Sequence, residues 1–76
     1  MRIYTNYNDE ILELNEVSFS ITTYEELILL KSFIKQCIND IKEDDFFEHK
    51  HFSDYLEENK TQDDNCNDII IYKEKD

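Results

Sequence analysis

The side chains best suited to chemistry in this sequence are two histidines, His49 and His51, which stand two residues apart. On a strand, residues i and i+2 project from the same face, so the two imidazoles could approach one zinc ion. Glu48, Asp54 and Cys66 are the groups that could complete such a site. Structural zinc sites usually contain closely spaced cysteine pairs, and this chain has none. We therefore interpret the histidines as residues that pack or face a partner, and we predict no metal site and no cofactor.

No catalytic residue is predicted either. The chain contains no glycine, which excludes the glycine-rich phosphate loop, the dinucleotide-binding fingerprint and the nucleophile elbow. Cys37 lies among Ile34, Ile38 and Ile41 at helical spacing, an arrangement typical of an inert core thiol. Cys66 is surrounded by carboxylates, which disfavour its thiolate. Paired acids carry little information in a chain that has 19 of them, and we predict that the protein is not an enzyme.

The dominant feature of the composition is negative charge. The 76 residues include 19 acidic and 8 basic side chains, which gives a formal net charge of −11. That field opposes direct binding of DNA or RNA and of an anionic membrane surface. No run approaches the ~20 apolar residues of a membrane span, and the first residues show no secretion signal. We expect one cytoplasmic domain over residues 1–76, with its cysteines reduced.

The acidic side chains concentrate in two stretches, residues 40–48 and 57–68. Solubility needs only a modest excess of charge. A net charge of −11 exceeds that need, and it produces a field that attracts basic proteins and accelerates their encounter. We therefore predict a basic partner, such as a toxin, a nuclease or a nucleic-acid-binding effector. The expected contact residues are Asp44, Asp45, Glu48, Asp54, Glu57 and Glu58, with Tyr55 as an aromatic anchor.

Two strands are predicted near the N-terminus, over residues 2–7 and 10–21. Asn8 and Asp9 form the expected turn between them, because Asn and Asp tolerate positive φ where glycine is absent. Within the second strand the apolar residues change parity at positions 15 and 16, which predicts a bulge or a tight bend there. A clear alternation of apolar residues and serines follows this point. Its apolar members are Val17, Phe19 and Ile21.

One long helix is expected next. Thr23 and Glu26 match a capping box, with Thr23 at the N-cap position. Glutamates in the first turn and lysines further along suit the helix dipole. Ile28, Leu29 and Phe33 broaden the apolar stripe, so the helix should lie across a sheet. The stripe itself is defined by residues at helical spacing, which are Leu27, Leu30, Ile34, Cys37 or Ile38, and Ile41.

The stretch over residues 49–56 fits two secondary structures. As a helix, it aligns Phe52, Tyr55 and Leu56 on one face. As a strand, it places His49 and His51 on one face. Periodicity alone does not decide between the two.

The C-terminal part divides into a loop and a strand. Residues 57–68 are rich in Asn, Asp and Glu, as in a solvated loop. Residues 69–73 form a β-branched run that predicts a final strand. An edge strand can pair with a second copy across a two-fold axis, so a homodimer is left open.

The predicted element order is strand–strand–helix–strand–strand. The helix is followed by His49-x-His51-Phe52-x-Asp54-Tyr55, and the chain closes with Asp68-Ile69-Ile70-Ile71. In these features residues 10–73 resemble small bacterial immunity proteins of polymorphic toxin systems. The resemblance implies a strand over residues 49–55. It also implies a cytoplasmic protein that binds a cognate toxin and masks the active surface of that toxin.

Taken together, these patterns predict an α+β fold, in which one long helix packs on one face of an antiparallel sheet of about four strands (ββαββ). The preferred function is that of an immunity protein, a stoichiometric inhibitor that covers a basic toxin or nuclease through its acidic surface. A second hypothesis is a phage-encoded anti-defence inhibitor, an anti-CRISPR or anti-restriction protein that mimics nucleic acid. A third is a small metal-binding regulator that uses His49 and His51.

Overall fold

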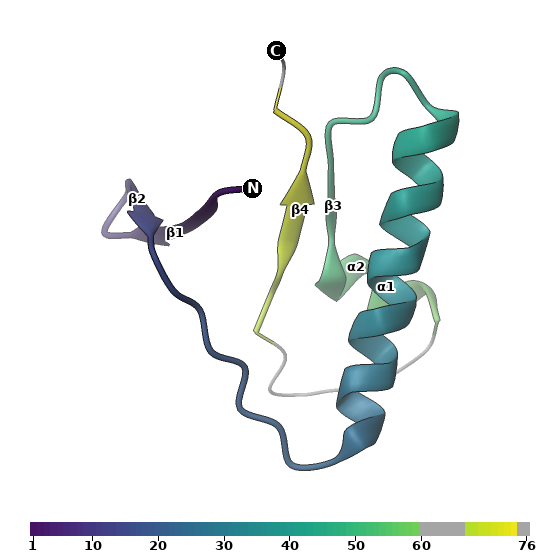
Figure 1. The fold of residues 1–76 in the computed structure, drawn as a ribbon, viewed down its shortest axis with the longest axis horizontal. Coiled ribbons are helices and arrows are strands. Elements are labelled where there is room, and N and C mark those ends of the chain that lie inside the picture. The colour runs from purple at the N-terminus through teal and green to yellow at the C-terminus, as the bar shows by residue number, and fades with distance from the viewer. Residues whose placement is uncertain (60–66, 75–76) are drawn as a thin grey trace.

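The computed structural model describes residues 1–59 and 67–74. It has an α+β fold, with two helices and four short strands in the described part of the chain (Figure 1). The strands form two separate antiparallel pairs, β1–β2 and β3–β4. The prediction of a single four-stranded sheet is therefore wrong. In chain order the elements are β1 (Ile3–Tyr7), β2 (Glu10–Leu14), α1 (Tyr24–Glu43), β3 (His49–His51), α2 (Phe52–Glu58) and β4 (Ile70–Tyr72).

The β1–β2 hairpin turns at the predicted position. Asn8 and Asp9 adopt positive φ angles of 49° and 63°, as a two-residue hairpin turn of type I′ requires. The register pairs Tyr7 with Glu10 and Ile3 with Leu14. Asn and Asp thus take the conformation that glycine supplies in many other hairpins.

The second strand is shorter than predicted, because β2 ends at Leu14 and residues 16–21 have no regular structure. With Ile3 opposite Leu14, residues 17–21 extend past the end of β1, and none of the described strands lies beside them. A strand without a neighbour has no hydrogen-bonded ladder, whatever its side-chain pattern. The parity change at positions 15 and 16 therefore marks the end of the strand, where the chain bends at Asn15, and not a bulge.

Helix α1 begins where the sequence predicts. Thr23 is the N-cap residue, with extended backbone angles, but its side chain makes no cap hydrogen bond. Glu26 Oε2 instead accepts a hydrogen bond from the backbone N–H of Thr22 at 3.3 Å. The helix ends at Glu43, and the N–H of the C-cap residue Asp44 donates to the carbonyl of Asp40 at 2.9 Å. None of the described helices is long and apolar enough to cross a membrane.

The core is small and lies between the two helices. Phe33 and Cys37 of α1 and Leu56 of α2 are the buried apolar residues among those described. The ring of Phe33 lies 5.1 Å from that of Phe52 and 5.6 Å from that of Tyr55, measured between centroids. Edge and offset contacts of this kind add to the burial of large rings. The apolar stripe predicted from Leu27 onward is thus only partly buried, and the contact between α1 and α2 centres on Phe33.

Residues 49–55 form a short strand followed by a helix, so the prediction of a strand throughout this stretch is wrong. Strand β3 stops at His51, and α2 then aligns Phe52, Tyr55 and Leu56, as the helical alternative required. The change occurs because groups from a distant segment satisfy the first N–H groups of α2. The Phe52 N–H donates to the carbonyl of Ile69 at 2.8 Å, and the Ser53 N–H donates to Asp68 Oδ1 at 2.9 Å.

The final strand appears as predicted, shortened to β4. Its register with β3 pairs His49 with Tyr72 and His51 with Ile70. In Figure 1, β3 lies between β4 and α1, and α2 follows at the lower end of β3. The predicted loop over residues 57–68 begins inside α2, and its residues 60–66 lie outside the described residues.

Candidate functional site

The predicted contact residues lie at the two ends of β3. One group, Asp44, Asp45 and Glu48, occupies the turn between α1 and β3 (Figure 1). The other group comes from α2, directly after β3. The length of β3, about 10 Å at ~3.3 Å per residue, separates the two groups along the chain. We call these residues the acidic surface: Asp44, Asp45, Glu48, Asp54, Glu57 and Glu58.

In the first group, one of the three carboxylates is hydrogen-bonded to the local backbone. Asp44 Oδ1 accepts a hydrogen bond from the Phe46 N–H at 2.9 Å, and the Asp44 carbonyl accepts from the Phe47 N–H at 3.1 Å. Asp44 therefore shapes the turn. Asp45 and Glu48 are exposed, and neither side chain forms an ion pair with a described residue. These two carboxylates are free to meet a partner.

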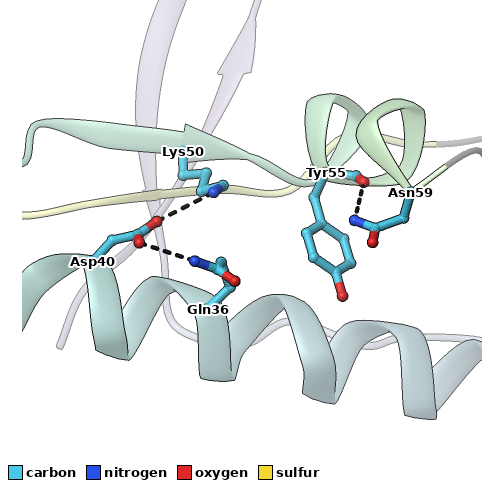
Figure 2. Close-up of polar contacts among 5 residues, drawn as sticks. All are labelled: Gln36, Asp40, Lys50, Tyr55 and Asn59. Atoms are coloured by element: carbon cyan, nitrogen blue, oxygen red, sulfur yellow. Dashed lines mark hydrogen bonds and ion pairs between the residues drawn. The ribbon is translucent and has the colours of Figure 1, made fainter.

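In the second group, all three carboxylates are exposed on α2. Asp54 lies in the first turn of α2. None of Asp54, Glu57 and Glu58 forms an ion pair with a described residue. Tyr55 differs, because its ring is half-buried against Phe33. Its carbonyl accepts the Asn59 Nδ2–H at 2.8 Å, as Figure 2 shows. The structure thus places Tyr55 in the aromatic core, with only part of its ring exposed.

Asp40, the first acid of the stretch over residues 40–48, is paired inside the molecule. Its carboxylate accepts hydrogen bonds from Lys50 Nζ at 3.1 Å and from Gln36 Nε2 at 3.0 Å (Figure 2). Hydrogen bonds from Gln36 and then Lys50 lower the pKa of Asp40. The pair joins α1 to β3 and leaves Asp40 with little freedom to contact another protein. No local pattern in the sequence predicts this pair, because Asp40 and Lys50 lie in different elements.

The two histidines lie on one face of β3, as their spacing predicts. Their ring centroids are 5.3 Å apart in an edge-to-face arrangement. His51 Nδ1 contacts Asp68 Oδ2 at 2.6 Å, and the hydrogen bond with Asp68 raises the pKa of His51. Within the described part of the chain, no group of three His, Cys, Asp or Glu side chains is placed to hold a metal ion. Cys66, the cysteine considered as a ligand, lies outside the described residues.

Asp68 joins three elements of the fold. Its Oδ2 meets His51 of β3, its Oδ1 accepts the Ser53 N–H at the start of α2, and it stands two residues before β4. Partial burial by itself raises the pKa of Asp68, but hydrogen bonds from His51 and Ser53 outweigh that effect and lower it overall. In the sequence, Asp68 belongs to an acidic loop and begins the closing run Asp68-Ile69-Ile70-Ile71, and no local pattern marks it as a helix cap.

The remaining thiol and the hairpin show no chemistry of their own. Cys37 is buried, and desolvation raises the pKa of its thiol, which keeps the sulfur in its unreactive protonated form. The hairpin meets β4 through Tyr4 and Tyr72, whose rings lie 6.4 Å apart. A hydrogen bond with Tyr4 raises the pKa of Arg2, and burial raises the pKa of Tyr72.

Comparisons with protein families, with curated proteins and with solved structures return no match to this chain. The resemblance to immunity proteins therefore remains a hypothesis based on the motifs quoted above.

Proposed function

We propose that this protein is a stoichiometric inhibitor that binds a basic target, a toxin or nuclease, through the acidic surface and covers the active site of that target. The observation that carries the proposal is the exposure of Asp45, Glu48 and the three α2 carboxylates, none of which is ion-paired with a described residue. Unpaired carboxylates in a chain of net charge −11 repel one another. A cationic partner relieves that repulsion when it binds.

The shape of the molecule also supports masking of a protein. Its extents are 36 × 33 × 19 Å, so it is flattened along one axis and of similar length along the other two. Imitation of a length of nucleic acid, the second hypothesis, calls for carboxylates along an elongated surface.

The test is a pull-down from cells of the source organism with tagged protein. The acidic variant carries Asp45→Asn, Glu48→Gln, Asp54→Asn, Glu57→Gln and Glu58→Gln. The matched control removes the same charge elsewhere, with Asp9→Asn, Glu10→Gln, Glu13→Gln, Glu16→Gln and Glu25→Gln. We expect the wild type and the control to retain one basic protein, which elutes below about 0.5 M salt because exposed charges are then screened.

The acidic variant should lose that protein and its inhibition. Equal loss in both variants would show that total charge matters and that the acidic surface does not. Recovery of an acidic partner that resists salt would contradict the proposal altogether.

A further inference from the structure

Helix α1 exposes large apolar side chains on the side away from the core. Their exposed fractions run from 41 % at Ile34 to 69 % at Tyr24. In Figure 1, α1 lies at the right edge of the molecule, and β3 and β4 lie to its left. Single exposed apolar residues are ordinary, but a contiguous group marks an interaction site. The group consists of Tyr24, Leu27, Ile28, Ile34 and Ile38.

Lysines accompany these apolar residues. Lys31, Lys35 and Lys42 are exposed, and they repeat at i, i+4 and i+11, which keeps them on one side of an α-helix. None of them forms an ion pair with a described residue. We call the five apolar residues and these three lysines the outer face of α1.

The outer face of α1 contains no acid. At ~100° per residue, Glu26 and Asp40 fall on the side of Phe33, and Glu25 and Glu43 fall beyond the edge of the outer face. A chain with 19 acidic and 8 basic residues thus keeps one apolar face locally basic. Its charge is opposite in sign to that of the acidic surface.

The spacing of the apolar residues suits a helical partner. Leu27, Ile34 and Ile38 stand at i, i+7 and i+11, which forms a stripe along a helix about 30 Å long at ~1.5 Å per residue. Such a stripe receives the apolar side of a second helix by ridge-into-groove packing.

We propose that the outer face of α1 is a docking site for an amphipathic helix of another protein, whose apolar stripe is flanked by Asp or Glu. Charge decides between this occupant and a second copy. An antiparallel pair of α1 helices centred at Lys35 would place this lysine opposite its own copy, and like charges in contact are destabilising. The inference goes beyond the proposed inhibitor function, because it concerns a separate surface that attracts the opposite charge.

The test measures binding of a labelled synthetic helix to the full chain by fluorescence anisotropy. The probe is a peptide of about five turns with a leucine stripe flanked by glutamates, and its counterpart has lysine at each glutamate position. We expect the glutamate peptide to bind at least about tenfold more tightly. Ile34→Ser should weaken binding by about tenfold, and Lys31→Glu with Lys35→Glu should reverse the preference.

Matched controls alter exposed residues elsewhere. Phe19→Ser removes an exposed aromatic side chain outside α1, and Lys73→Glu reverses an exposed lysine outside α1; both should bind as the wild type does. All variants are checked for unchanged circular dichroism, and the changed residues of α1 are exposed, so the fold should persist.

Tighter binding of the lysine peptide by the wild type would overturn the proposal, because the net charge alone would then govern binding. No binding of the glutamate peptide at about 100 µM would overturn it as well. Self-association that Ile34→Ser abolishes would assign the face to a second copy instead. The acidic variant should keep full peptide affinity, so the proposed inhibitor function and this inference can fail separately.

Discussion

His51 and Asp68 are joined by a contact of 2.6 Å between Nδ1 and Oδ2, although 17 positions separate them in the sequence. The same carboxylate accepts the Ser53 N–H through its other oxygen. One side chain therefore holds the end of β3, the start of α2 and the approach to β4. The stability of this corner depends on the charge of an imidazole.

The pH dependence of stability follows from that contact. The hydrogen bond with Asp68 raises the pKa of His51, and the charge of Asp54 acts in the same direction. The stabilisation is then fully present below the unfolded pKa of about 6.5, and it is lost as the pH rises through the higher folded value. We expect the free energy of unfolding, measured by urea titration, to fall as the pH rises above about 6.5. His51→Gln should flatten this dependence, and an unchanged slope in that variant would contradict the assignment.

Substitutions of Asp68 separate its two roles. Asp68→Ala removes the ion pair and the cap of α2, and loss of a cap costs about 1 kcal/mol. Asp68→Asn keeps an oxygen that can accept the Ser53 N–H, so the free energy of unfolding should fall by less. Both variants should lose the pH dependence attributed to His51. If Asp68→Asn were as unstable as Asp68→Ala, the cap would contribute little and the charge would be the main effect.

Substitution of Phe33 and of Phe19 should change the stability of the protein by different amounts. Phe33 is fully buried, with 0 % exposure, whereas Phe19 is 54 % exposed. Phe33→Ala should cost about 3–5 kcal/mol, which is comparable to the whole stability of a chain of this size, about 4–11 kcal/mol. Phe19→Ala should change the free energy of unfolding by about 0.5 kcal/mol or less. Thermal denaturation compares the two, and equal costs would show that residues 16–21 pack in solution.

Amide hydrogen exchange should alternate along β4. The carbonyl of Ile69 accepts the Phe52 N–H and the Lys73 N–H donates to Glu48, so the backbone groups of residues 69, 71 and 73 face β3. Those of Ile70 and Tyr72 face away from it. We expect these two amides to exchange faster than those of residues 71 and 73, as followed by NMR. Equal protection would mean that another strand covers the outer edge of β4.

The elements defined by local chemistry were predictable from the sequence. The Asn8–Asp9 turn, the start of α1 at Thr23 and the β-branched final strand all depend on preferences of a few adjacent residues. The exposed position of the acidic surface was predictable as well, because charged groups avoid burial. Net charge is a property of composition alone.

Only the tertiary structure decided which of these segments pair. Residues 16–21 carry a strand pattern. Leu14 pairs with Ile3, the first residue of β1, so β1 does not extend beside residues 16–21. Residues 52–58 became a helix because Asp68 and Ile69 satisfy its first N–H groups, and a periodicity shared by two conformations cannot reveal a cap that lies 15 residues away. The apolar stripe of α1 was read from spacing, but which side of it is buried depends on where Phe52 and Tyr55 pack. Hydrogen bonds and ring contacts between residues distant in the sequence determine these outcomes, because such contacts form only when the chain has folded.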